Sequence, residues 1–92
     1  MNINEQNNMQ VRITPREQEV YDYIIEFMEK NLFSPTVREI MVDLKFQSTS
    51  SVHYHIKNLE KHGYITVKEG EPRTIRPVGY KLVKIQEENT GC

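Results

Sequence analysis

Length, charge and cysteine content bound the protein before any motif is considered. The chain has 92 residues, a formal net charge of −1 and one cysteine, Cys92. A chain of this length forms one small domain, and a single cysteine excludes an internal disulfide framework, which favours the reducing cytoplasm. No apolar run reaches the length of a membrane-spanning helix, and no signal-peptide pattern opens the sequence. We therefore expect a small cytoplasmic domain.

The charged residues are distributed unevenly along the chain. Residues 14–32 carry two basic and five acidic side chains, a net charge of −3. Residues 45–84 carry eight basic and three acidic side chains, a net charge of +5. A polyanion would respond to the basic part of such a molecule rather than to its total charge.

The first predicted helix spans residues 15–31. Residues 1–13 are rich in Asn and Gln and are expected to form a flexible tail, except that Ile13 is expected to pack on the helix. Thr14 is the predicted N-cap, and Glu17 completes a capping box around Pro15. An apolar stripe follows at helical spacing, comprising Val20, Ile24, Phe27 and Met28, widened by Tyr21, Tyr23 and Ile25.

A second, shorter helix is predicted over residues 37–44. Pro35 ends the preceding segment, and Thr36 with Glu39 repeats the capping-box pattern. The inward-facing residues of this helix should be Val37, Ile40, Met41 and Leu44. Residues 45–47 form a tight turn, in which Phe46 is expected to pack at the junction with the next helix.

The third predicted helix, residues 48–62, has two contrasting faces. Val52, Ile56 and Leu59 form a core stripe, with Ser48 as N-cap and Gly63 at the C-terminal cap. The opposite face contains no carboxylate and carries Ser50, His53, Tyr54, Lys57 and Lys61. Such a face suits a DNA major groove, where base edges and phosphates accept hydrogen bonds. The short helix, the turn and this helix together indicate a helix-turn-helix.

A small β-hairpin is predicted after the third helix. Its strands cover residues 64–68 and 73–77 around a turn at 69–72, with Ile65 and Ile75 facing the helices. The expected fold is therefore mostly α with one hairpin, a three-helix winged helix-turn-helix over residues 14–83. Residues 84–92 are expected to be a flexible tail or a truncated linker.

These elements occur in the order of the winged-helix family, and the sequence resembles one branch of it, the N-terminal DNA-binding domain of LexA-type repressors. The matching segments are TPREQEVYDYI at 14–24, SPTVREI at 34–40, FQSTSSVHYHIKNLEKHGYI at 46–65 and PRTIR at 72–76. The match is ungapped and covers roughly residues 13–77. The STSSVHYH run is more similar to the Gram-positive form of the family than to the Gram-negative form.

The resemblance implies a bacterial transcriptional repressor of the SOS type that binds a palindromic operator in double-stranded DNA. It implies base-facing roles for the recognition-helix residues Ser48, Ser50, Ser51, His53 and Tyr54. It also implies phosphate contacts at Thr14, Arg16 and Arg73. The geometry of the two helices adds Arg38 and Lys57, and the hydroxyl of Thr49 belongs to the same N-terminal turn, a ready-made anion site. A weak homodimer on DNA is expected, because one helix-turn-helix covers only a half-site.

The sequence departs from the LexA pattern in two respects. The self-cleaving peptidase domain, which also dimerises these repressors, has no counterpart in this chain, so we expect no enzymatic activity. Lys45 stands where the family usually has Gly in the turn between the helices. If this residue keeps a positive φ, Lys costs about 1 kcal/mol relative to Gly.

Other readings of the same residues are weaker. His53 and His55 are two apart and project about 200° apart on a helix, so they cannot chelate a metal. His55 is expected to be packed and hydrogen-bonded, and His62 to lie on the surface. Tyr54 has the alternative of packing on its own helix. We expect no metal, cofactor or small-molecule ligand.

One alternative function stays open, a winged helix used for contact with another protein. The surface concerned is the acidic face of the first helix, formed by Tyr21, Tyr23, Glu26, Glu29 and Lys30. Affinity for a protein partner that does not depend on salt, without DNA binding at low salt, would favour this alternative.

Overall fold

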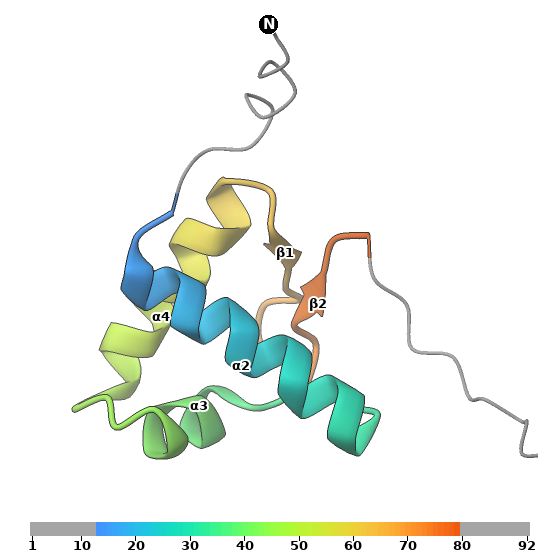
Figure 1. Ribbon diagram of the computed structural model, residues 1–92, viewed down its shortest axis with the longest axis horizontal. Helices are drawn as coiled ribbons and strands as arrows, with labels where there is room; N and C mark the ends of the chain where they lie inside the picture. The colour runs from blue at the N-terminus through green and yellow to red at the C-terminus, as the bar shows by residue number, and fades with distance from the viewer. Residues whose placement is uncertain (1–12, 80–92) are drawn as a thin grey trace, which may run out of the picture.

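The structure is a computed structural model in which residues 13–79 are described. Its elements are α2 (Pro15–Asn31), α3 (Val37–Asp43), α4 (Thr49–Lys61), β1 (Ile65–Thr66) and β2 (Arg76–Pro77), as Figure 1 shows. The predicted three-helix winged helix-turn-helix is confirmed. The expected tails at 1–12 and 84–92, and the domain boundary at residue 83, lie outside the described residues.

Both predicted capping boxes are present and explain where α2 and α3 begin. The backbone N–H of Glu17 donates to Thr14 Oγ1 at 3.1 Å, and the backbone N–H of Thr14 donates to Glu17 Oε1 at 3.2 Å. Thr36 and Glu39 form the same pair of bonds at 3.1 and 2.9 Å. Each box satisfies two N–H groups that the first helical turn leaves without an intrahelical partner.

The turn between α3 and α4 requires one residue in the left-handed region. Helix α3 ends at Asp43, one residue earlier than predicted, because Leu44 has left helical geometry (φ −99°, ψ 5°). Lys45 follows at φ 61°. Ser48 and His62 are the caps of α4 rather than its first and last residues, which shortens the predicted helix by one residue at each end.

The core is formed by the predicted stripes of the helices and one residue from each arm of the hairpin. Every core residue has at most 6% of its surface exposed; they are Val20, Ile24, Met28, Ile40, Val52, Ile56, Leu59, Ile65 and Ile75. Ile13 and Phe46 pack against this core, as expected. Phe27 is a correction, because it is only half-buried and contacts the rings of Tyr23 and Phe33 at the edge of the core, each at a centroid distance of 5.8 Å.

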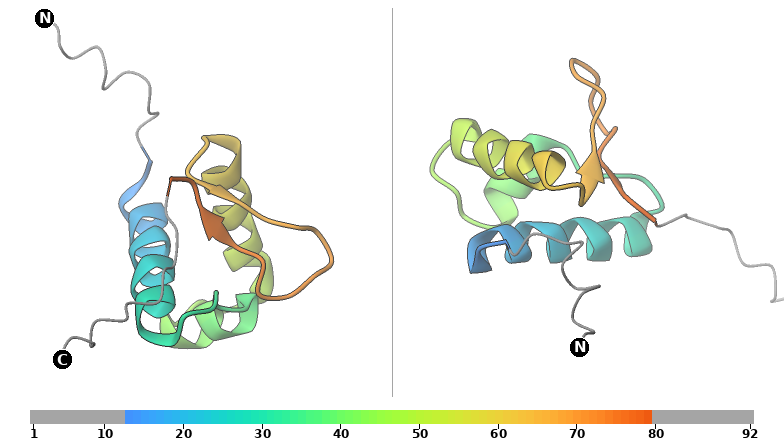
Figure 2. Two further views of the ribbon diagram at one scale, coloured as in Figure 1. Left: turned by 90° about the vertical axis from the view of Figure 1, so that its right-hand side faces the viewer. Right: turned by 90° about the horizontal axis from the view of Figure 1, so that it is seen from above.

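Helices α2 and α4 pack across this core, and the hairpin projects away from α2 (Figure 2). A polar contact joins the two helices, because Asn58 Nδ2 on α4 donates to Glu17 Oε2 at 2.8 Å. This bond fixes the position of α4 along α2 at a buried carboxylate.

The wing is much shorter than predicted. Strands β1 and β2 pair antiparallel over two residues each, with Ile65 opposite Pro77. The predicted pairing is interrupted because Arg73 adopts φ 59° and because Thr74 bonds through its side chain, accepting from Lys68 N at 3.0 Å. Side-chain bonds thus replace the backbone ladder at the tip.

Candidate nucleic-acid interface

The outer face of α4 is exposed and carries the predicted polar residues. Ser50, His53, Tyr54 and Lys57 are all exposed, Tyr54 to 64%. The ring of Tyr54 meets His55 edge-on with centroids 5.4 Å apart, which fits the packing expected of it as an alternative. More than half of the residue's surface is still exposed, so the tyrosine remains accessible to a ligand.

The hydroxyl-bearing residues in the N-terminal turn of α4 differ in their hydrogen bonds and in their exposure. Ser48 is the N-cap and accepts from Ser51 N at 3.3 Å, while the Oγ atoms of the two serines lie 3.4 Å apart. Ser50 is exposed, and Thr49 is half-buried. A helix N-terminus with exposed hydroxyls favours an anion, because its first N–H groups and the helix dipole both point outward.

A cleft of about 430 Å³ separates α4 from the wing. Its lining brings together predicted site residues from three elements, namely Arg38, Thr49, His53, Lys57 and Arg73. Lys57 Nζ spans the cleft to Glu69 Oε2 at 3.2 Å, and both groups are well exposed. The cleft thus brings basic side chains of α3, α4 and the hairpin to one side of the molecule, together with the carboxylates of Glu60, Glu69 and Glu71.

Thr14 and Arg16 lie away from this cleft, at the start of α2. The Thr14 hydroxyl accepts the capping bond and remains exposed. Arg16 donates to the carbonyl of Leu44 at 2.8 Å, pairs with Glu19, and lies over the Phe46 ring at 4.0 Å. Arg16 thus connects α2 to the turn before the recognition helix.

Arg73 is also engaged within the protein. Its guanidinium donates to both carboxylate oxygens of Glu39 and to the carbonyl of Ser34, each at 3.0 Å, and lies over the Phe33 ring at 4.7 Å. The Arg73 guanidinium, followed by the backbone N–H of Thr36, holds the pKa of Glu39 below its usual value of 4.5. The sequence analysis did not identify Glu39 or Ser34 as partners of this arginine.

Comparison with known proteins independently supports the family resemblance inferred from the sequence. The model of one protein family, the LexA DNA binding domain, matches residues 10–74. The chain belongs to the LexA DNA-binding domain family. It is 37% identical over 78 residues to the LexA repressor of Staphylococcus epidermidis, covering 85% of this chain and 38% of that protein. It is 37% identical over 73 residues to the LexA repressor of Acetivibrio thermocellus, covering 79% and 34%.

A third relative, the LexA repressor of Petrotoga mobilis, is 45% identical over 56 residues, covering 61% of this chain and 27% of that protein. The chain therefore spans between 27% and 38% of the length of these three curated relatives. The resemblance inferred from the sequence is confirmed, and the matched part is the DNA-binding part of LexA.

This domain has a buried polar cluster on the inner side of α4, around Glu17. Burial alone would raise the pKa of Glu17, but hydrogen bonds from Asn58 and Thr14, with the nearby His55 and His62, lower it below 4.5. His55 is packed as expected, with its ring 5.4 Å from that of Phe46, but its Nδ1 makes no hydrogen bond and lies 3.8 Å from Glu17 Oε2.

His62 is a second correction in this cluster. It is half-buried, and its Nδ1 is buried without a hydrogen-bond partner, so the imidazole does not lie on the surface as expected. Within residues 13–79, no group of three His, Cys, Asp or Glu side chains is placed to hold a metal ion.

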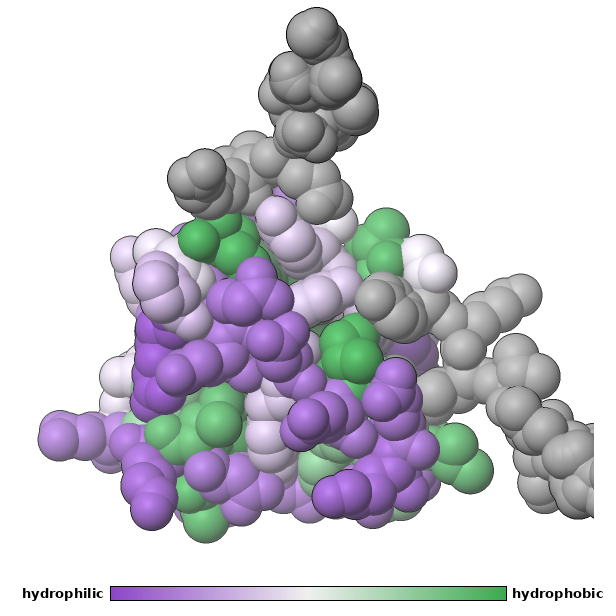
Figure 3. All heavy atoms as spheres, viewed as in Figure 1, coloured by the Kyte–Doolittle hydropathy of each residue, from purple (hydrophilic) through white to green (hydrophobic). Residues whose placement is uncertain are grey.

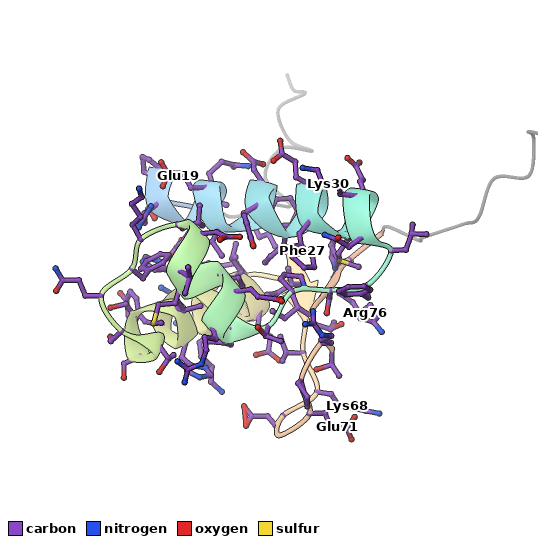
Figure 4. The ribbon with its side chains drawn as sticks, turned by 90° about the horizontal axis from the view of Figure 1, so that it is seen from below. Glu19, Phe27, Lys30, Lys68, Glu71 and Arg76 are labelled. Atoms are coloured by element: carbon purple, nitrogen blue, oxygen red, sulfur yellow. The ribbon has the colours of Figure 1, made fainter. Side chains whose placement is uncertain are left out.

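The outer face of α2 is the surface named by the alternative function. Figure 3 shows that the face carrying α2 is largely hydrophilic, and Figure 4 places Glu19 and Lys30 on the outer side of the helix. The Tyr23 hydroxyl donates to Asp43 at 2.6 Å, and burial together with this carboxylate raises the pKa of Tyr23. Tyr21 packs edge-on against Tyr64 at 5.6 Å. Both tyrosines thus have partners within the domain.

None of the helices within residues 13–79 combines the length and the apolar character that crossing a bilayer requires.

Proposed function

We propose that the protein is a sequence-specific repressor that places α4 in the major groove of double-stranded DNA and the wing on the phosphate backbone. The observation that carries this proposal is the exposed outer face of α4 beside the cleft to the wing, where Ser50, His53, Tyr54 and Lys57 include no carboxylate. Glu60 lies at the flank of this face and lines the cleft. Membership of the LexA DNA-binding domain family supports it, and the relatives named above are called LexA repressors.

Base reading falls on the first half of α4 in this proposal. Ser48, Ser50 and Ser51 bring hydroxyls that read bases weakly, so discrimination falls on His53 and Tyr54. His53 can donate to the N7 or O6 acceptor of guanine, and Tyr54 can pack on a thymine methyl group. One good base contact discriminates by about 1–3 kcal/mol.

Phosphate binding is assigned to the cationic groups around the cleft. Arg38 and Lys57 are exposed there, and Thr49, the first residue of α4, lines the same cleft. Lys57 exchanges its exposed partner Glu69 for a phosphate at small cost, because exposed ion pairs contribute little to stability. Thr14 and Arg16 flank this footprint from α2.

A palindromic operator and two bound copies complete the proposal. One helix-turn-helix covers a half-site, so two copies on an inverted repeat double the contact surface. Dimerisation on DNA is weak in this proposal, and the protein acts in the bacterial cytoplasm.

Fluorescence anisotropy tests the proposal directly. The chain is titrated against random duplex DNA and against a duplex selected from a random pool, over a series of salt concentrations. We expect the binding constant to fall steeply with salt, because phosphate contacts release counterions, and we expect the selected site to be an inverted repeat. Absence of binding at low salt would overturn the proposal and direct attention to a protein partner of α2.

A further inference from the structure

Arg73 has an unusual environment for a residue expected to touch DNA. Its backbone lies in the left-handed region at φ 59°, which non-glycine residues adopt only where the surrounding structure holds them there. Three hydrogen bonds and the ring of Phe33 hold its guanidinium. A guanidinium that donates two parallel hydrogen bonds to one carboxylate forms the strongest geometry of an arginine–carboxylate ion pair.

The partners of Arg73 belong to the start of the helix-turn-helix. Glu39 is the third residue of α3 and already serves the capping box with Thr36. Ser34 is fully buried in the segment that leads into α3. Arg73 therefore ties the tip of the wing to the rigid first turn of α3, across 34 positions of sequence.

Apart from the burial of Ile65 and Ile75 in the core and the packing of Val67 against it, few contacts join the wing to the helices. The two strands pair over only two residues each, so the ladder fixes the base of the hairpin and not its tip. On the other side, the wing meets α4 through the exposed Lys57–Glu69 pair, a kind of contact that contributes little. The Arg73 contacts are the most extensive polar link between the wing tip and the helices among the described residues.

We propose that Arg73 is the positioning residue that holds the wing against α3 for DNA binding, and that it is not itself a phosphate ligand. This inference rests on the proposed function. To reach a phosphate, Arg73 would have to release Glu39, which would leave a carboxylate without its partner beside a polyanion.

The two roles of Arg73 predict opposite effects of Glu39→Gln. Glutamine preserves the capping box but loses the charge-assisted pair. If Arg73 positions the wing, Glu39→Gln weakens DNA binding. If Arg73 binds phosphate and Glu39 merely restrains it, the same substitution frees the arginine and strengthens binding.

Arg73→Lys is a second substitution that distinguishes a role in positioning the wing from a role in binding phosphate. A lysine retains the point charge that a phosphate needs, but it cannot reproduce the bidentate fork or the stacking on Phe33. We expect Glu39→Gln and Arg73→Lys each to weaken binding on the order of five-fold with an unchanged salt slope. The double variant should be no weaker than the worse single variant, because both break one link. Arg38→Gln, a substitution of an exposed arginine in the same cleft, is the matched control and should flatten the slope by about 0.9.

Amide hydrogen exchange supplies a readout that does not depend on DNA. In both single variants, exchange should accelerate at residues 67–75 while α4 keeps its protection, which also shows that the domain is folded. Unchanged exchange in the wing, or tighter DNA binding by Glu39→Gln, would overturn the positioning role. If the unsubstituted protein fails to bind duplex DNA at low salt, the proposed function fails, and the exchange data still decide whether Arg73 holds the wing.

Discussion

Non-glycine residues with a positive φ differ in this domain in whether their side chains are held by partners. Within residues 13–79, three non-glycine residues have positive φ: Leu32, Lys45 and Arg73. Leu32 ends α2 and Lys45 makes the turn between α3 and α4, and both side chains are exposed. Arg73 is the exception, because its side chain is held by partners. The first two positions therefore carry a conformational cost without a compensating contact of the Arg73 kind.

Replacing Lys45 by glycine should stabilise the domain. Glycine removes the clash of Cβ at φ 61°, and we expect a gain of about 1 kcal/mol, equivalent to a rise of about 4–8 °C in Tm for a domain of this size. Thermal denaturation followed by circular dichroism measures the change. Lys45→Ala, which removes the charge but keeps Cβ, is the control and should leave the Tm nearly unchanged. A lower Tm for the glycine variant would contradict the prediction.

Two neighbouring residues of α4 should respond differently to substitution. Lys57→Ala should weaken binding to all duplexes alike and flatten the salt slope by about 0.9, because it removes one phosphate contact. His53→Ala should leave the slope unchanged and relax the preference at one base pair. Site selection from a random pool distinguishes the two effects. An unchanged selected site for His53→Ala would remove that residue from base reading.

At the scale of elements, features set by neighbouring residues could be predicted from the sequence, whereas contacts between residues far apart in the chain could not. The helices, their caps and the core stripes were predictable, because capping boxes and a period of 3.6 residues are written in neighbouring positions. The contacts of Arg16 with Leu44 and of Arg73 with Glu39 join residues 28 and 34 apart and leave no local pattern. The strands were overestimated for a related reason, because the Thr74 side chain takes over bonds that the pattern assigned to the backbone.

The contact between α2 and α4 should make stability depend on pH. The folded-state pKa of Glu17 lies below 4.5, so its ionised form is favoured by folding. That contribution is complete above the unfolded-state pKa and is lost as the pH falls through the lower folded-state value. In Glu17→Gln, which keeps a capping-box residue, this contribution is absent at every pH. The variant should therefore be less stable than the parent at neutral pH. The difference in their free energies of unfolding should narrow below about pH 4.5.

Urea denaturation over a pH series measures this difference. Glu29→Gln, on the exposed side of α2, controls for the loss of one negative charge from the helix. A difference between parent and Glu17→Gln that stays constant from neutral to acid pH would show that Glu17 does not link folding to protonation.

At the scale of the whole molecule, the outer side of α2 and the tip of the wing lie on opposite sides (Figure 4). Glu19 and Lys30 mark the outer side of α2, and Lys68 and Glu71 mark the wing tip at the far end of the view in Figure 4. Because fields decay over about 10 Å at 0.1 M salt, DNA on the α4 side is screened from the acidic face. A net charge of −1 is thus compatible with DNA binding.

Two charge reversals of equal size test this orientation. Glu69→Lys at the wing should raise affinity for any duplex several-fold and steepen the salt slope by about 1–2. Glu29→Lys on the outer side of α2 should change affinity by less than about two-fold. Anisotropy titrations at two salt concentrations are sufficient. Equal effects of the two reversals would mean that α2, too, faces the nucleic acid.

The division of α4 into a holding face and a reading face has a consequence for the evolution of target choice. Val52, Ile56 and Leu59 secure the helix in the core, whereas the exposed His53 and Tyr54 make no contribution to that core. In the proposed function, exchanging these two residues changes what the domain recognises without removing a contact of the core. Drift to a new operator, or selection of one from a library randomised at these positions, can proceed through intermediates that all remain folded.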